Sequence, residues 1–169
     1  MFRSNNVKRT ALILILVILA LDLFTKWIIY NYMTPYQIIP VIDNFFNIVY
    51  AKNFGSAFSF LSTAPGWFRK PFFFIINIAA MSFIVYIMFR DQKNKTQFLA
   101  FASVLGGALG NFLNRIYPGY AIDFLDVKLT STYHWPSFNV ADIAITCGLI
   151  LVMLDMAKME SKKKRSAKK

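Results

Sequence analysis

Four aspartates lie inside or at the edge of strongly apolar segments, at positions 22, 123, 142 and 155. Ionisable groups in apolar surroundings are costly to bury, so each is a candidate for function. Asp123 has apolar neighbours on both sides, and Asp142 falls in the first turn of an expected helix, after the good capping residue Asn139. Two close carboxyls share a proton, so one can act as general base on water and the other as general acid. An ion or proton site is an equally common use of two such aspartates.

Asp22 and Lys26 are spaced four residues apart, in the order that favours an ion pair on a helix. We therefore interpret Asp22 first as half of a structural pair and only second as a reacting group. Asp155 is followed by several lysines, and we expect it to be solvated.

The composition indicates an integral membrane protein. The 169 residues are 57% hydrophobic and only 16% charged, whereas soluble domains are about 45–50% apolar and about 25% charged. High hydrophobicity excludes a disordered chain, and the scarcity of basic residues within the apolar segments argues against a nucleic-acid module. One Cys and one His exclude a disulfide framework, a multi-Cys zinc site and a His cluster, so we expect no metal and no cofactor.

Four segments are apolar enough to span a bilayer, which takes about 20 residues. They make residues 1–169 one polytopic domain with a basic tail at 158–169, and their approximate ranges are 11–30, 72–89, 97–113 and 140–156. The first segment could instead be a cleaved signal peptide. A retained span is the better interpretation, because no small-residue cleavage site follows and the sequence after Leu21 is bulky and charged.

The basic residues predict the orientation. Thirteen of the 19 Lys and Arg residues lie in the N-terminal segment, the connection at 90–95 and the C-terminal tail, against five in the two long connections at 31–71 and 114–139. The positive-inside rule then places both termini in the cytoplasm and both long connections outside. In the first long connection, the segments 37–42, 45–50 and 57–61 have the composition of short strands.

Glycines and asparagines form two dense motifs, Asn53-Phe54-Gly55-Ser56-Ala57-Phe58 and Gly106-Gly107-Ala108-Leu109-Gly110-Asn111. The spacing of Gly106 and Gly110 is typical of close helix packing. The simplest role for Asn53 and Asn111 is a hydrogen bond between neighbouring segments.

Taken in order, these motifs resemble those of bacterial lipoprotein signal peptidase, also called signal peptidase II. The resemblance extends from about residue 10 to residue 157, and it rests on several motifs in one order: Asp22-Leu23-Phe24-Thr25-Lys26, the two motifs above continued through Asn114-Arg115, Ala121-Ile122-Asp123-Phe124 and Phe138-Asn139-Val140-Ala141-Asp142.

The resemblance implies four transmembrane helices and a small extracytoplasmic β-sheet cradle, which we expect in the first outer loop. It implies an aspartic endopeptidase of the bacterial inner membrane that cuts prolipoproteins N-terminal to a diacylglyceryl-modified Cys. Asp123 and Asp142 match the catalytic pair. The residues that match the supporting positions are Asn53, Gly55, Asn111, Arg115, Asn139, Asp22 and Lys26. The expected partners are the lipidated substrates and membrane lipids, with no nucleic acid, and the expected state is a monomer with its active site at the outer leaflet.

Three positions depart from the family pattern, which usually has Gln at Leu23, Ala at Ser56 and Asp at Asn114. An Asn at position 114 cannot supply the charge for an Asp–Arg pair, so Arg115 needs another partner. Two alternatives stay open. One is a small transporter or channel subunit that uses Asp22, Lys26 and Asp142 as a proton or ion path. The other, motivated by Asn114, is an inactive relative that binds lipoproteins.

Overall fold

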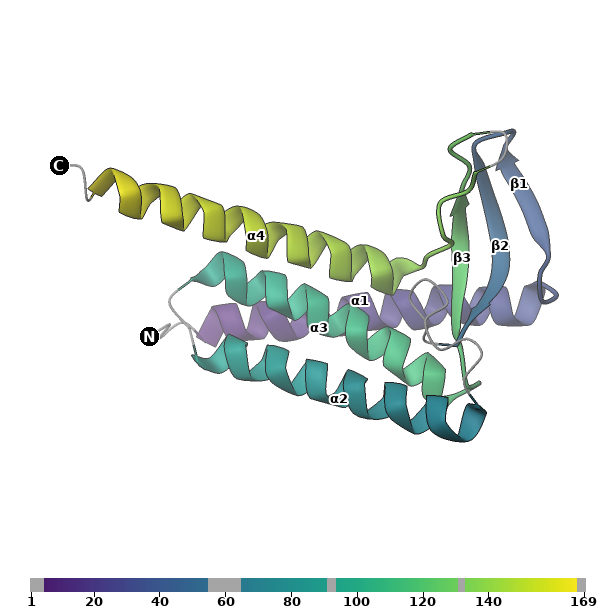
Figure 1. Ribbon diagram of the computed structural model, residues 1–169, viewed down its shortest axis with the longest axis horizontal. Coiled ribbons are helices and arrows are strands. Elements are labelled where there is room, and N and C mark those ends of the chain that lie inside the picture. The colour runs from purple at the N-terminus through teal and green to yellow at the C-terminus, as the bar shows by residue number, and fades with distance from the viewer. Residues whose placement is uncertain (1–4, 55–64, 91–93, 131–132, 167–169) are drawn as a thin grey trace.

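The computed structural model describes residues 5–54, 65–90, 94–130 and 133–166. Within these ranges the chain forms four long helices and one small sheet (Figure 1), and the elements are α1 (Asn5–Tyr32), β1 (Ile38–Ile42), β2 (Phe46–Asn53), α2 (Gly66–Arg90), α3 (Lys95–Ile116), β3 (Ala121–Val127) and α4 (Val140–Ser166). All four helices are long and apolar enough to cross a membrane. The predicted membrane fold is confirmed.

Each helix is longer than its apolar segment. α2 begins at Gly66 and includes Pro71, so the helix starts before the apolar span predicted at about 72–89. Proline fits here because its missing N–H leaves only the carbonyl of Trp67, one turn earlier, without its helical partner.

α4 continues as a helix to Ser166, about ten residues past its apolar part, because the lysine-rich segment is a good helix former. Asp155 in this helix is not simply solvated as expected. It is partly buried and accepts a hydrogen bond from Asn94, whose own Oδ1 caps α3 by accepting the N–H of Thr96.

α3 lies at the centre of the bundle and packs against α1, α2 and α4. Its glycines permit these close contacts, as predicted. A Cβ on Gly106 would lie 3.2 Å from Ile15 Cα of α1, and one on Gly107 would lie 2.4 Å from the carbonyl oxygen of Ala141 in α4. The glycine motif therefore lets two helices approach two different sides of α3.

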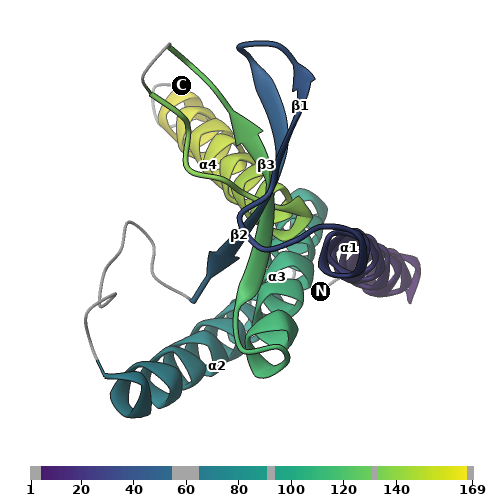
Figure 2. The same cartoon turned by 90° about the vertical axis from the view of Figure 1, so that its right-hand side faces the viewer.

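The sheet is antiparallel with the order β1-β2-β3. β1 and β2 lie in the first long connection, as predicted. The third strand, β3, comes from the second long connection, so the expected confinement of the sheet to the first outer loop is wrong. The proposed strand at 57–61 lies outside the described residues. Pairing of β2 with β3 ties the two long connections together at one end of the bundle (Figures 1 and 2).

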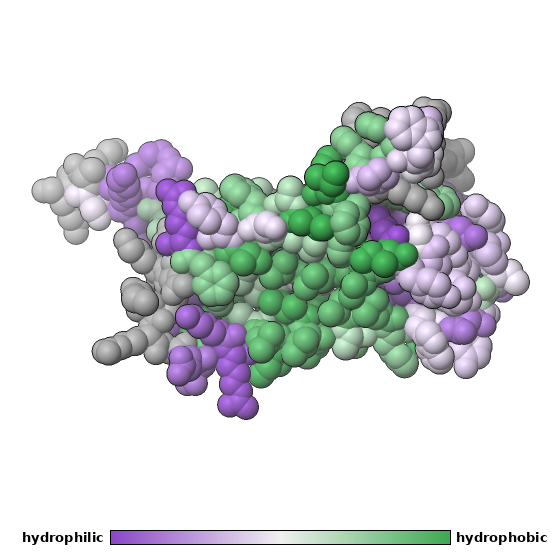
Figure 3. All heavy atoms as spheres, turned by 90° about the horizontal axis from the view of Figure 1, so that it is seen from below, coloured by the Kyte–Doolittle hydropathy of each residue, from purple (hydrophilic) through white to green (hydrophobic). Residues whose placement is uncertain are grey.

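An apolar surface covers the middle of the helices, with polar residues gathered at both ends of the molecule (Figure 3). Large hydrophobic side chains such as Leu16, Ile75 and Met153 are about half or more exposed there. Such a surface is stable against hydrocarbon rather than water. Both termini lie at the end opposite the sheet (Figure 1).

Candidate active site

Asp123 lies near the start of β3, in the sheet that crosses one end of the helix bundle (Figure 1). Its Oδ2 accepts the Asn53 Nδ2–H at 2.9 Å, and its Oδ1 accepts the Asn139 Nδ2–H at 2.6 Å. The carboxyl is 5% exposed. Burial, assisted by the charge of Asp142, raises the pKa of Asp123 to about 6.

Asp142 is held by the cap of α4. The Asn139 side-chain Oδ1 accepts the Asp142 N–H at 3.0 Å, and the Asp142 Oδ2 accepts the Asn139 N–H at 3.1 Å. This reciprocal arrangement is a capping box with Asn and Asp in its two positions. The sequence-based prediction that Asn139 caps this helix is confirmed, and the cap leaves Asp142 at the positive end of the helix.

Asn139 connects the two carboxyls. Its Oδ1 caps the helix that carries Asp142, while its Nδ2 donates to Asp123 Oδ1 and also to Asn111 Oδ1 at 3.1 Å. Asn111 in turn donates to Asp142 Oδ1 at 2.8 Å. The structure therefore brings together Asp123 and Asp142, which are 19 positions apart in the sequence.

Behind this cluster lies the predicted ion pair. Lys26 Nζ is 2.7 Å from Asp22 Oδ2 and donates to Asn111 Oδ1 at 2.8 Å. The other oxygen of Asp22 accepts the Ala141 N–H at 2.9 Å. Both charged side chains are almost completely buried, at 1% and 0% exposure. The ion pair forms, as the spacing suggested, and it joins α1 to α3 and to the first turn of α4.

Arg115 and Asn114 point to different partners. Arg115 donates to the Asn111 carbonyl oxygen at 3.3 Å, while its buried Nε makes no hydrogen bond within the described part of the chain. Asn114 accepts the Ile122 N–H at 3.4 Å and thereby holds the start of β3. Asn114, which departs from the Asp usual in the family, therefore uses its side-chain oxygen for a backbone contact to Ile122, and it does not pair with Arg115.

Gly55 and Ser56 lie outside the described residues.

A cavity of about 390 Å³ lies beside Arg115, and the residues that line it include Phe54, Phe73, Asn77 and Phe112. Phe54 and Phe112 belong to the sequence motifs, whereas Phe73 and Asn77 do not, and none of the four was predicted to lie at the site. The sequence feature that could have indicated Asn77 is its amide side chain, the only one in the apolar span at 72–89.

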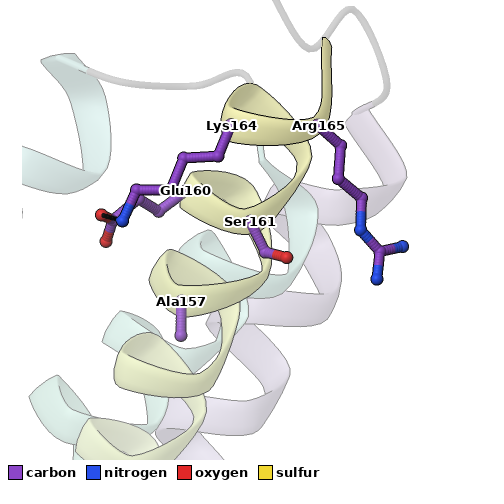
Figure 4. Close-up of a pocket in the computed structure, with 5 residues that line it drawn as sticks. All are labelled: Ala157, Glu160, Ser161, Lys164 and Arg165. Carbon is purple, nitrogen blue, oxygen red and sulfur yellow. Dashed lines mark ion pairs between the residues drawn. The ribbon is translucent and has the colours of Figure 1, made fainter. Parts of the chain in front are cut away.

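A second hollow, at the other end of the molecule, is an open surface along the last turns of α4 (Figure 4). Its polar side chains include an exposed Lys164–Glu160 ion pair at 2.7 Å. Among the described residues, no three His, Cys, Asp or Glu side chains are grouped to hold a metal.

Comparisons with known proteins assign the family. A family model described as signal peptidase (SPase) II matches residues 14–158. The chain belongs to the signal peptidase II family. It is 44% identical over 147 residues to a lipoprotein signal peptidase of Geobacter sulfurreducens, with 86% of this chain and 89% of the relative covered. It is 40% identical over 147 residues to a lipoprotein signal peptidase of Syntrophus aciditrophicus, covering 86% and 91%.

The fold comparison agrees with signal peptidase II membership. A solved structure titled as a bacterial membrane enzyme aligns with a TM-score of 0.81 and 33% identity over 91% of each chain. A second structure with a similar title gives a TM-score of 0.76 and 32% identity, covering 87% of this chain and 92% of the other. Signal peptidase II enzymes are membrane proteases that remove signal peptides from prolipoproteins, so the chain is a membrane-bound hydrolase.

Proposed function

We propose that this chain is an aspartic endopeptidase that removes the signal peptide from diacylglyceryl-modified prolipoproteins by cutting N-terminal to the lipidated Cys. The observation that carries the proposal is the attachment of both Asp123 and Asp142 to Asn139. One asparagine holds the two carboxyls at the end of the bundle where the apolar helices meet the sheet.

The surroundings of the two carboxyls favour different roles. The raised pKa of Asp123, about 6, favours its protonated form, which can donate a proton. Asp142 accepts hydrogen bonds from Asn111 and from the backbone of Asn139 at a helix N-terminus, a setting that stabilises negative charge. Asp142 then removes a proton from water as the water attacks the peptide carbonyl carbon, while Asp123 donates a proton to the carbonyl oxygen.

A tetrahedral diol forms in this step, and no bond to the enzyme is made. In its collapse, the protonated Asp142 donates its proton to the leaving nitrogen while the Asp123 carboxylate takes a proton from a diol hydroxyl, so the C–N bond breaks and both aspartates return to their starting protonation states. No metal or cofactor takes part in the proposed reaction.

The apolar surroundings suit a lipid-linked substrate. The cavity beside Arg115 is lined by Phe54 of the outer connection and by aromatic residues of α2 and α3. A signal helix and diacylglyceryl chains could approach from the bilayer past the exposed apolar helix faces. This proposal predicts that the unlipidated precursor is a poor substrate, because it lacks the apolar group that the bilayer and the cavity accommodate.

We also propose the orientation that the basic residues predict. Both termini face the cytoplasm, the sheet and the two aspartates lie at the outer leaflet of the inner membrane, and the protein acts as a monomer among membrane lipids. The location of both termini at the end opposite the sheet supports this arrangement (Figure 1).

The test is cleavage of a diacylglyceryl-modified prolipoprotein by the purified protein in liposomes, with the product mass identifying the broken bond. Asp123→Asn and Asp142→Asn should each abolish cleavage, whereas Asp43→Asn, at an exposed turn, should not. Cleavage at another bond, or equal cleavage of the unlipidated precursor, would contradict the proposed specificity. Ion flux in place of cleavage would favour the transporter alternative, and binding without product would favour the inactive relative.

A further inference from the structure

The only histidine of the chain lies outside the site just described, beside the sheet. His134 Nδ1 is 3.0 Å and 2.9 Å from the two carboxyl oxygens of Asp126. The Oδ2 of Asp126 also accepts the Asn47 Nδ2–H at 2.7 Å. Asp126 is 8% exposed and His134 is 45% exposed. Asn47 belongs to β2 and Asp126 to β3, so these three side chains, which we call the sheet clamp, link two strands to the segment before α4.

That segment runs back along β3 into the active site. The Trp135 N–H donates to the Val127 carbonyl oxygen at 2.8 Å, and the Phe138 N–H donates to the Leu125 carbonyl oxygen at 3.0 Å. The next residue is Asn139. Figures 1 and 2 show the chain leaving β3, turning, and returning beside it to the first turn of α4.

The clamp does not contact the two active-site carboxyls in any bond that the structure describes. Asp123 and Asp126 are three residues apart on one strand, so their side chains point to opposite faces of the sheet. The influence of the sheet clamp on the active site must therefore pass through the backbone, from His134 along residues 135–138 to Asn139. Since Asn139 holds both Asp123 and Asp142, a shift of this segment changes the distance between the two carboxyls.

We propose that His134 and Asp126 are positioning residues that hold the returning segment in register, so that Asn139 sets the geometry of the aspartate pair. This inference rests on the proposed function for its kinetic consequence. Small misplacements of reacting groups lower the rate of the chemical step strongly. The proposed substrate contacts are the exposed apolar helix faces and the cavity beside Arg115, and none of the described bonds of the clamp involves a residue that lines this cavity. We therefore expect the effect to fall on kcat rather than on KM.

The histidine allows a matched pair of variants. In His134→Asn the amide nitrogen occupies the place of Nδ1 and can still donate to Asp126, whereas in His134→Gln it lies nearer the place of Nε2. We expect His134→Ala and His134→Gln to lower kcat about three- to tenfold with KM unchanged, and His134→Asn to restore most of the activity. Tyr133→Ala, an exposed side chain on the same segment, is the control and should match the wild type.

Amide hydrogen exchange gives a readout that is independent of cleavage. The N–H groups of Phe138 and Asn139 are bonded to Leu125 and to Asp142, so they report the register of the segment. Their exchange should accelerate in His134→Ala and His134→Gln but not in His134→Asn or Tyr133→Ala. Wild-type protein that fails to cleave would overturn the proposed function, while this exchange pattern would still support the clamp.

The proposal is overturned if His134→Ala leaves both kcat and exchange unchanged, if Gln rescues as well as Asn, or if the whole loss appears in KM. It is also overturned if the activity falls only in proportion to the fraction of protein unfolded in a thermal melt, because a purely structural role predicts that result.

Discussion

Removal of the Lys26 charge should destabilise the whole bundle. The ammonium group lies 2.7 Å from Asp22 Oδ2 and 2.8 Å from Asn111 Oδ1, with 1% of the lysine side chain exposed. Lys26→Met replaces it with an apolar side chain of similar reach. Asp22, which is 0% exposed, then keeps only the Ala141 N–H as a described donor.

The magnitude follows from the geometry. Two unit charges at this separation attract by about 6 kcal/mol at an effective dielectric constant of about 20, and desolvation offsets much of this attraction. Removal of one partner is worse than removal of both, because it leaves an uncompensated buried charge, at a cost of about 3–5 kcal/mol. For a chain of this size, that corresponds to a fall in Tm of about 6–20 °C.

A double variant tests the cause. Asp22→Asn combined with Lys26→Met removes both charges, and the new amide oxygen can still accept the Ala141 N–H. It should be more stable than Lys26→Met alone, since no charge is left unpaired. A leucine at position 22 would not serve, because a Cβ on Gly110 would lie only 2.4 Å from Asp22 Oδ2, and the contact between these helices has no room for branching methyl groups.

The assay is thermal unfolding in detergent, followed by circular dichroism, with Lys158→Met in the exposed end of α4 as the control. The reasoning is refuted if Lys26→Met melts within error of the wild type and the control. It is also refuted if the Tm of the double variant lies below that of Lys26→Met, because the two changes would then add as independent losses.

Three further results are expected. Because Asp123 is the proposed acid and its pKa is raised from 3.8 to about 6, kcat/KM should fall as the pH rises through about 6; a rate that rises there would reverse the assigned roles. Gly107→Ala places a Cβ 2.4 Å from the Ala141 carbonyl oxygen and should cost about 1–3 kcal/mol in a thermal melt, whereas Gly66→Ala, with nothing within 4 Å, should cost less than this; equal losses would contradict the packing argument. Asn114→Asp should leave the cleavage rate unchanged, because a carboxylate oxygen can accept the Ile122 N–H equally well; a large gain would show that the missing charge limits the enzyme.

Much of the site could be predicted from local patterns. The four-residue spacing of Asp22 and Lys26, the position of Asn139 before a helical segment and the four-residue spacing of Gly106 and Gly110 are all read within one or two helical turns. Each of these features is present in the structure with the predicted partner or contact. The proximity of Asp123 and Asp142 could be predicted only as a shared location at one membrane surface.

The features that were missed depend on contacts between distant segments. β3 pairs with β2 across about 70–80 residues, and its alternation is obscured because both faces are largely buried. Asn114 and Arg115 are adjacent in the sequence, but their side chains bond to different parts of the chain. The order of residues in a sequence motif does not show in which direction each side chain points. The helical extension of α4 was missed because hydropathy marks the end of a membrane span and not the end of a helix.

The central claim is that Asp123 and Asp142 together hydrolyse the peptide bond. Its most direct test is single-turnover cleavage of a diacylglyceryl-modified prolipoprotein in liposomes, with enzyme in excess, for the wild type, Asp123→Asn and Asp142→Asn. We expect each variant to lose at least about a thousandfold in rate while it still binds the substrate and melts as a folded protein. A single-turnover rate close to that of the wild type in either folded variant would contradict the claim.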